Sequence, residues 1–153
     1  LPNLLSKKQK EVQYLTSMLN DLPGLNVPVV KPQCEHAYYC YPMVLTDGLE
    51  KKRDFIVEAL QAEGVPGLSG GYINIHTYPM YTKRIAYGKS GFPWSIYDPE
   101  KTVKYGQGTC PVAEDLHNNS FMKLEICLYD FNLSDMELIA AAFKKVWLEM
   151  GSF

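Results

Sequence analysis

The sequence lacks any long apolar run and any strong charge bias. Hydrophobic residues make up 46% of the chain, but no run approaches the roughly 18 consecutive apolar residues of a membrane-spanning helix. The formal net charge is −2, so no field of one sign favours nucleic acid or an anionic membrane surface. No charged-then-apolar leader begins the chain. We therefore expect a cytoplasmic protein that binds neither nucleic acid nor membranes.

The common nucleotide-binding and hydrolase motifs are also missing. The tripeptide Gly88-Lys89-Ser90 resembles the end of a phosphate-binding loop, but Lys83 stands where that motif requires a glycine. Neither the Gly-x-Gly-x-x-Gly pattern of dinucleotide-binding folds nor the Gly-x-Ser-x-Gly pattern of hydrolases occurs. These absences exclude the simplest nucleotide-binding and serine-hydrolase interpretations.

Cysteines are few and poorly spaced for a metal site. Cys34, Cys40 and His36 lie close together in the sequence, but no second pair of ligands accompanies them. Cys110 and Cys127 stand apart. A chain of 153 residues with this hydrophobic content does not need disulfides to fold. We therefore expect reduced thiols and no metal.

Hydrophobic periodicity predicts two strands and four helices. Pro42 cannot donate to a ladder, which predicts an edge position or a bulge in the first strand. Asp47 with Glu50, and Ser134 with Glu137, have the spacing of capping boxes. The predicted helices cover residues 3–22, 49–63, 111–118 and 134–150, and the predicted strands cover residues 36–45 and 121–128.

The order of these elements predicts an α+β fold, a small antiparallel sheet with helices packed on one face. We expect one small domain over residues 1–153, with a third strand within residues 71–75. Phe55 is expected to face inward from the second helix. The alternation that begins at Met122 predicts a buried Leu128 at the end of the last strand.

Residues 64–111 have neither a helical nor a strand pattern and are rich in Gly, Pro and Tyr. Structureless loops longer than about 12–15 residues are usually functional or disordered, and the aromatic content argues against disorder. Lys83 and Arg84 are candidates for an anion clamp, with solvated charges as the alternative. The tyrosines are candidates for stacking on a ring or a sugar, with simple packing as the alternative.

The three histidines differ in what their positions favour. His36 begins a strand and is expected to be a structural hydrogen-bonding residue. His117 lies in a short polar helix and is expected to be solvated. His76 lies in the tyrosine-rich stretch, which makes it the better candidate for a general base.

Five segments of the chain, in this order, resemble the carboxy-terminal small domain of the DegT/DnrJ/EryC1/StrS-type sugar aminotransferases. The most specific are the elements 110–114 and 63–66, and one departure is Glu125-Ile126 where the family usually has Leu-Pro. Residues 1–22 match the end of the helix that links the two domains of such enzymes. The segments are CEHAYYCYPMVL, RDFIVEALQAEGVP, TYPMY, CPVAEDLHNNSFMKLEICL and the capped terminal helix.

This resemblance implies a pyridoxal-phosphate enzyme of the aspartate-aminotransferase fold, fold type I. Such enzymes transfer an amino group, usually from glutamate or glutamine, to a keto-sugar, often nucleotide-linked, or to a keto-cyclitol. They work as homodimers, and their amino-terminal domain supplies the cofactor lysine. No counterpart of that lysine occurs here, since Lys123 lies on the wet face of a predicted strand. The resemblance therefore implies no catalytic residue and no bound cofactor in this chain by itself.

By the same analogy, the tyrosine-rich stretch borders the substrate at a dimer interface. The resemblance assigns Tyr72, His76, Tyr78 and Tyr81 to the substrate-side walls and Lys83 to an anion contact. Two other hypotheses stay open. The chain is alternatively a stand-alone, non-catalytic binding module of the same fold, or an unrelated α+β enzyme that uses His76 with a nearby carboxylate.

Overall fold

The computed structural model describes residues 2–98 and 103–151. The chain divides into two compact units. Unit 1 takes in residues up to Gly71 and from Asn119 onward, and unit 2 spans residues 72–118. No helix in the described ranges is long and apolar enough to cross a membrane. One domain over residues 1–153 stays a prediction.

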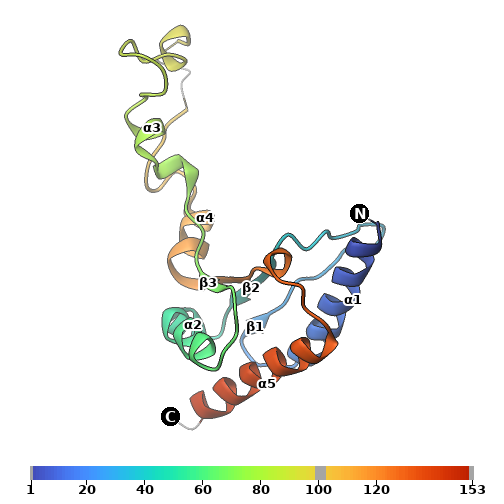
Figure 1. Ribbon diagram of the computed structural model, residues 1–153. Helices are drawn as coiled ribbons and strands as arrows, with labels where there is room; N and C mark the ends of the chain where they lie inside the picture. The colour runs from blue at the N-terminus through green and yellow to red at the C-terminus, as the bar shows by residue number, and fades with distance from the viewer. Residues whose placement is uncertain (1, 99–102, 152–153) are drawn as a thin grey trace. The chain divides into compact units, whose positions relative to one another are not determined.

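Among the described residues, unit 1 has one sheet of four strands, in the order β1-β2-β4-β3 (Figure 1). Every neighbouring pair is antiparallel. The two long strands pair at the centre, where Met43 lies opposite Met122. The strands are β1 (Leu25–Asn26), β2 (Tyr41–Leu45), β3 (Leu68–Gly70) and β4 (Phe121–Leu124).

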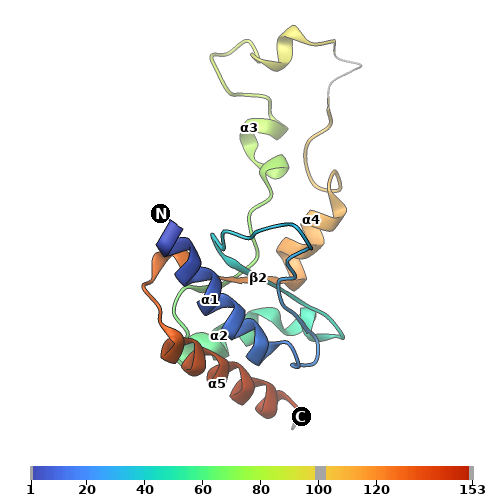
Figure 2. The same ribbon diagram turned by 90° about the vertical axis from the view of Figure 1, so that its right-hand side faces the viewer.

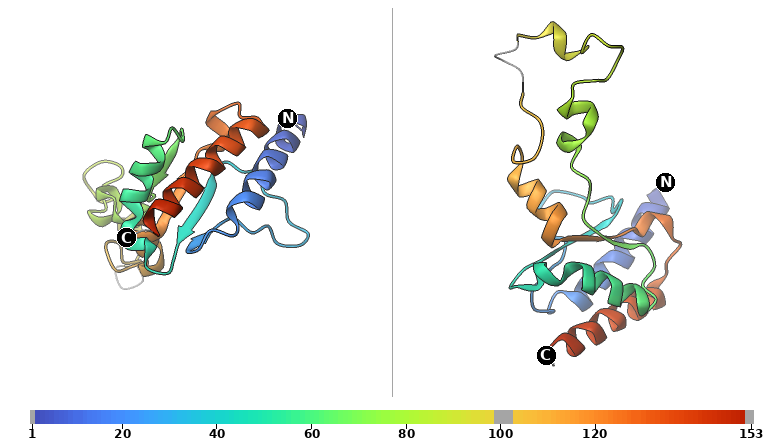
Figure 3. Two further views of the ribbon diagram at one scale, coloured as in Figure 1. Left: turned by 90° about the horizontal axis from the view of Figure 1, so that it is seen from below. Right: turned by 90° about the vertical axis from the view of Figure 1, so that its left-hand side faces the viewer.

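Three helices cover one face of this sheet (Figure 3). They are α1 (Pro2–Leu19), α2 (Arg53–Ala62) and α5 (Leu133–Met150). Helix α5 packs against both α1 and α2, and α2 packs against β3 and β4. The α+β fold with a small antiparallel sheet, expected from the order of elements, is therefore confirmed.

The core of unit 1 lies between the sheet and these helices. In β2, Tyr41, Met43 and Leu45 are buried and alternate with half-buried residues, and in β4 Met122 and Leu124 do the same. Each large apolar side chain buried in this way contributes about 1.5–3 kcal/mol to folding. The helices supply the opposite wall of the core with Val12, Leu15, Leu19, Ile56, Leu60, Ile139, Phe143 and Val146.

Both predicted strands are shorter than expected. Strand β2 begins only at Tyr41 and lies inside the sheet, so the edge position predicted from Pro42 is wrong for the strand as a whole. The proline is tolerated because β1 pairs only with Leu45 and Val44 and does not reach it. Strand β4 ends at Leu124 and the chain then turns into a short 3-10 helix. Leu128 is therefore 73% exposed, and the prediction that it is buried is wrong.

The start of the second helix also differs from the prediction. A 3-10 helix over Leu49–Lys52 precedes α2. The Glu50 carboxylate accepts a hydrogen bond from the Gly48 N–H at 3.0 Å, so it does not form the expected box with Asp47. Phe55 is 59% exposed, and its predicted inward orientation is wrong. The buried face of α2 is centred on Ile56 and Leu60, with Val57 beside them, and Phe55 lies outside it.

Helix α5 begins with a capping box, but two residues earlier than predicted. The Asn132 side chain accepts hydrogen bonds from the N–H groups of Ser134 and Asp135, at 2.8 and 3.2 Å. The Asp135 carboxylate accepts from the Asn132 N–H at 2.8 Å. The predicted pairing of Ser134 with Glu137 is therefore wrong, because asparagine is an equally good N-cap and comes first.

Unit 2 consists of short helical turns on two arms of chain (Figure 2). The outgoing arm contains a 3-10 helix (Ile75–Thr77) and α3 (Pro79–Thr82), and a second 3-10 helix covers Trp94–Ile96. The returning arm ends in α4 (Pro111–Asp115) and a π-turn over Leu116–Ser120. Residues 64–111, expected to be neither helix nor strand, thus contain β3 and α3. The third strand lies just before the residues 71–75 in which it was expected.

Candidate functional site

Two side chains that are far apart in the sequence meet in unit 2. His76 lies in the 3-10 helix of the outgoing arm, and Glu114 lies in α4 of the returning arm. The His76 Nε2 atom is 2.8 Å from the Glu114 Oε1 atom, and the two side chains are only 14% and 12% exposed. Close by, the Gly106 N–H donates to the His76 carbonyl at 2.9 Å. The two arms are therefore joined at His76.

Backbone donors surround the Glu114 carboxylate. The Gly108 N–H donates to both carboxylate oxygens, at 2.9 and 2.8 Å, and the Cys110 N–H donates to Oε1 at 3.1 Å. The Gly108 N–H, followed by His76 and Cys110, holds the pKa of Glu114 below its usual range. An ionised carboxylate with this many donors is a poor general base, because its charge is already stabilised.

The His76–Glu114 pair therefore functions best as an anchor. A histidine beside a carboxylate is also the arrangement that the general-base hypothesis for His76 requires. Here, however, the same Oε1 atom that contacts the imidazole also accepts from the Cys110 N–H. The geometry fixes the returning arm to the outgoing arm, which a structural hydrogen bond between the two side chains explains fully.

The local sequence explains why Glu114 takes this position. Pro111 is the first residue of α4, where its missing N–H costs nothing. Cys110 is then the N-cap residue, and its N–H donates a hydrogen bond to the Glu114 carboxylate. Glu114 lies four residues after the N-cap, one residue further than the side chain that closes a capping box. The Cys-Pro-Val-Ala-Glu element is thus a folding signal for the returning arm.

Three aromatic rings form a small cluster inside unit 2. Tyr81 lies 6.1 Å from Trp94 and 5.4 Å from Tyr105, measured between ring centroids. The Trp94 indole N–H donates to the Tyr105 hydroxyl at 3.3 Å. Aromatic pairs at such separations contribute roughly 0.5–1.5 kcal/mol beyond the area that they bury. The cluster gives unit 2 its own packing centre.

The residues predicted to line the substrate do not form one constellation in unit 2. His76 is held by Glu114, and Tyr81 belongs to the ring cluster. Tyr72 and Tyr78 are 58% and 41% exposed. Lys83 ends α3 as its C-cap residue and is exposed.

A polar cavity of about 390 Å³ lies within unit 2. Side-chain amides, hydroxyl groups, the His117 ring and the Glu114 carboxylate dominate its lining. Periodicity gave no signal for it, because its residues come from irregular segments of both arms. The described residues that line it are Asn74, Thr77, Thr82, Gly106, Gln107, Glu114, His117 and Asn118.

The other two histidines have structural roles. The His36 Nδ1 atom accepts from the Tyr38 N–H at 2.8 Å, and its ring stacks on Tyr38 with centroids 4.3 Å apart. The expectation for His36 is therefore met. The His117 Nδ1 atom accepts from the Tyr72 N–H at 3.0 Å. His117 is half-buried, so the prediction of a solvated ring is wrong.

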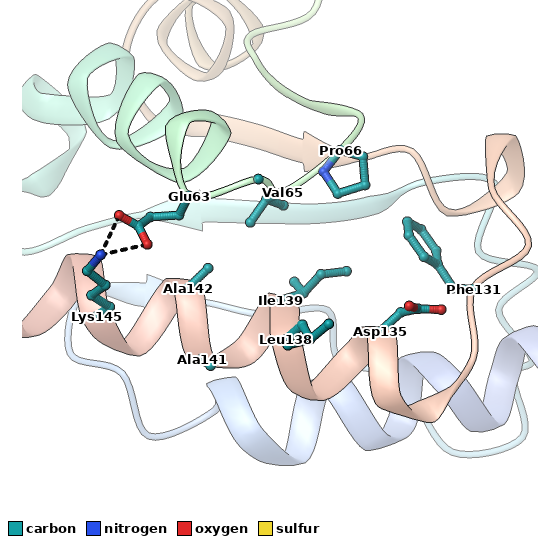
Figure 4. A pocket seen from close by; sticks show the side chains of 11 residues that line it. Glu63, Val65, Pro66, Phe131, Asp135, Leu138, Ile139, Ala141, Ala142 and Lys145 are labelled. Atoms are coloured by element: carbon teal, nitrogen blue, oxygen red, sulfur yellow. Dashed lines mark hydrogen bonds and ion pairs between the residues drawn. The ribbon is translucent and has the colours of Figure 1, made fainter.

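Unit 1 has two larger cavities with mainly apolar walls. One of about 450 Å³ lies between the end of α2 and helix α5 (Figure 4). Val65 and Ile139 lie toward its middle, and the ion pair of Lys145 with Glu63 crosses one end. The other, of about 690 Å³, is lined by the first turns of α1 and by residues 127–130.

Pyridoxal phosphate forms a Schiff base with a lysine amine, which must lie in a pocket that excludes water and holds the cofactor. Lys145 and Lys8 line the two unit 1 cavities, but the Lys145 Nζ atom is 2.7 Å from a Glu63 oxygen, and Lys8 donates to a backbone carbonyl at 2.7 Å. The Lys123 ammonium pairs with Glu125, and that hydrogen bond raises its pKa. The Glu63 carboxylate likewise raises the pKa of Lys145. These three amines, each already held by an oxygen acceptor, do not fit the cofactor.

A family model described as the DegT/DnrJ/EryC1/StrS aminotransferase family matches residues 1–103. The match stops short of the Cys-Pro-Val-Ala-Glu element, which carried much of the sequence resemblance. A curated relative, the uncharacterized protein MJ1066 of Methanocaldococcus jannaschii, is 29% identical over 102 residues. That alignment covers 63% of this chain and 26% of the relative.

Solved aminotransferase structures share the fold. Helicobacter pylori PseC, an aminotransferase involved in the biosynthesis of pseudoaminic acid, gives a TM-score of 0.62 at 17% identity, covering 95% of this chain and 33% of that one. DesV of S. venezuelae gives 0.64 at 16% identity, covering 93% and 31%. The 3-amino-5-hydroxybenzoic acid synthase gives 0.67 at 11% identity, covering 97% and 35%. The chain therefore spans about a third of the length of these structures.

Proposed function

Because the chain belongs to the DegT/DnrJ/EryC1/StrS aminotransferase family, we propose that it forms the carboxy-terminal small domain of a pyridoxal-phosphate-dependent aminotransferase. The proposed acceptor is a keto-sugar, often nucleotide-linked, or a keto-cyclitol, and the donor is glutamate or glutamine. The observation that carries this proposal is the match to the family model over residues 1–103. The fold likeness, which covers 93–97% of this chain but only 31–35% of each solved structure, supports it.

In this proposal the chain does not hold the cofactor. The lysine that binds pyridoxal phosphate belongs to an amino-terminal domain, and the cofactor there supplies the electron sink for amino transfer. Residues 1–22 contribute the end of the helix that joins the two domains. Lys123 remains a structural residue, because its ammonium is paired with Glu125.

Unit 2 is proposed to form the substrate-side wall of the active site at the interface of a homodimer. Tyr72 and Tyr78 present exposed ring surface, and Lys83 presents an exposed ammonium that suits an anionic group of the substrate. His76 and Tyr81 hold the wall in shape through Glu114 and the ring cluster. Fixing the wall in advance reduces the entropy that substrate binding must overcome.

Two preparations test the proposal. The 153-residue chain is mixed with pyridoxal phosphate, reduced with borohydride and analysed by peptide mass spectrometry; we expect no lysine with saturable, stoichiometric labelling. The natural gene product that contains this chain is then treated in the same way and assayed for 2-oxoglutarate formation from glutamate and a nucleotide-linked keto-sugar. We expect one labelled lysine outside these 153 residues, together with amino transfer.

Two outcomes would overturn the proposal. Stoichiometric labelling of a lysine in the 153-residue chain, with turnover, would place the cofactor in this chain. A natural gene product that neither binds pyridoxal phosphate nor transfers an amino group would leave the chain as a non-catalytic module of the same fold.

A further inference from the structure

We propose that Cys40 and Cys127 of unit 1 form an oxidation site, in which a peroxide joins the two thiols as a disulfide and a thiol reductant separates them again. The two residues flank the central strand pair of the sheet. Cys40 directly precedes β2, and Cys127 follows β4 within the 3-10 helix Ile126–Leu128. Both carry free thiols in the structure. The site is independent of the proposed function, which does not use either thiol.

The register of the central strands brings the two segments together. Tyr41 pairs with Leu124 at the end of the antiparallel ladder. Continued by one step, that register places Cys40 beside Glu125 and makes Cys127 its diagonal neighbour. Diagonal neighbours have Cα atoms about 7–8 Å apart, and a disulfide spans Cα distances up to about 7 Å. A closing movement of about 1 Å is therefore enough to join the two sulfurs.

Contacts beyond the ladder support this placement. The Cys127 thiol donates to the Tyr38 carbonyl at 3.2 Å, so its sulfur touches the backbone two residues before Cys40. Burial raises the pKa of the Cys40 thiol, and the charged neighbours that also act on this pKa include Lys123, Glu125 and Cys127. The two thiols therefore belong to one patch at this end of the central strands.

Both cysteines lie outside regular structure that would hold them apart. Cys40 is in a bend before β2, and Cys127 is in a single 3-10 turn. Segments of this kind adjust more easily than paired strands. The hydrogen bond from Cys127 to Tyr38 must break when the disulfide forms, but a thiol is only a weak donor. The closing movement therefore needs no change in the sheet itself.

The exposure of the two thiols sets the order of the chemical steps. Cys127 is exposed and lines the cavity of about 690 Å³, whereas Cys40 is half-buried. The Cys127 sulfur attacks hydrogen peroxide, which gives a sulfenic acid and one water. The Cys40 sulfur then attacks the Cys127 sulfur, and the hydroxyl group leaves with the Cys40 proton as a second water. The peroxide is reduced, and the two thiols are oxidised to one disulfide.

Peptide mapping tests this site. The reduced 153-residue chain is treated with hydrogen peroxide at low protein concentration, alkylated without reduction, digested and analysed by mass spectrometry. We expect a cross-linked peptide that joins Cys40 to Cys127, with the loss of two hydrogen atoms per chain. Dithiothreitol should restore both thiols.

Single variants assign the role of each cysteine. In Cys40→Ser the cross-link should be lost, and dimedone, which traps sulfenic acids, should label Cys127. In Cys127→Ser the cross-link should also be lost, and dimedone should leave the half-buried Cys40 unlabelled. Cys34→Ser is the matched control, because Cys34 is an exposed cysteine in the irregular segment that leads to Cys40. This variant should form the cross-link as the wild type does.

Three outcomes would overturn the inference. The first is a wild-type chain in which Cys40 and Cys127 stay unlinked while the exposed Cys34 or Cys110 is oxidised. The second is a cross-link from Cys40 or Cys127 to one of those other cysteines. The third is a Cys40–Cys127 cross-link that forms only in urea, because the folded strand pair would then not bring the thiols together. None of these outcomes bears on aminotransferase activity, so the proposed function is tested separately.

Discussion

Tyr41 allows a quantitative test of the core of unit 1. Its side chain is fully buried in β2, and its hydroxyl lies 2.9 Å from the Thr16 hydroxyl of α1. Burial, partly offset by the hydrogen bond with Thr16, raises the pKa of Tyr41 to about 12. In an unfolded chain a tyrosine ionises near pH 10. The folded state therefore keeps the phenol neutral over about two pH units in which the unfolded state ionises.

The sign and size of the effect follow from this difference. Below about pH 10 both states hold the proton, and the stability is fully present. Between about pH 10 and 12 the unfolded chain loses the proton first, so the free energy of unfolding falls. At about 1.36 kcal/mol for each unit of pKa difference, the loss is about 2.7 kcal/mol for this one group.

The substitution Tyr41→Phe should remove this loss. At neutral pH the variant lacks the hydrogen bond with Thr16, and we expect it to be about 1 kcal/mol less stable than the wild type. As the pH rises, the wild type loses stability through Tyr41 and the variant does not. The curves of unfolding free energy against pH for the wild type and the variant should therefore cross at about pH 11. Urea unfolding followed by tryptophan fluorescence, at steps from pH 8 to pH 11.5, measures both curves.

Thr16→Val is the matched control. It removes the same hydrogen bond but keeps the buried phenol, and the hydrogen bond lowers the pKa of Tyr41. Its alkaline loss should therefore be at least as large as that of the wild type. A constant difference in unfolding free energy between wild type and Tyr41→Phe, from pH 8 to pH 11.5, would refute the reasoning.

Two further predictions concern charged side chains. Lys8→Met should cost about 2 kcal/mol in urea unfolding, because Glu11, whose side chain is 3% exposed, keeps only the more distant Lys7 ammonium at 3.6 Å and loses the Lys8 ammonium at 3.3 Å. Adding Glu11→Leu should restore most of the loss, and a double variant as unstable as the single one would contradict the argument. Glu114→Gln should shift the amide resonances of Gly108 and Cys110 at neutral pH, because it removes the carboxylate charge that both N–H groups contact. Because these contacts lower the pKa of Glu114, the midpoint of the same shifts in the wild type should lie below about pH 4.3, the ordinary value for Glu. A midpoint above that pH would contradict the anchor.

The main elements of unit 1 were predictable because their patterns are local. Helices α1, α2 and α5 and the central strands all have an apolar period that matches their geometry. The errors lie where two local signals compete. Asn132 and Ser134 are both good N-caps, and only the packing of α5 selects the first one. The alternation in β4 continues past Leu124, although the chain leaves the sheet there.

The anchor in unit 2 was only half predictable, because it joins residues 38 positions apart. The setting of His76 among tyrosines marks it as a candidate. Glu114 belongs to the Cys-Pro-Val-Ala-Glu element of the family resemblance, but no periodic pattern links α4 to the outgoing arm. Pro111 at the first position of α4, followed by a glutamate that can fold back, was the available physical signal.

Unit 2 contains both aromatic rings that pack together and aromatic rings that stay exposed, and the exposed ones are relevant to the proposed function. The rings of Tyr81, Trp94 and Tyr105 pack against one another. Tyr87 and Tyr97 remain 71% and 61% exposed. Large apolar side chains that stay exposed in a group usually mark an interaction surface. In the proposed function, a wall that contacts a substrate and a second protein surface would carry exposed rings of this kind.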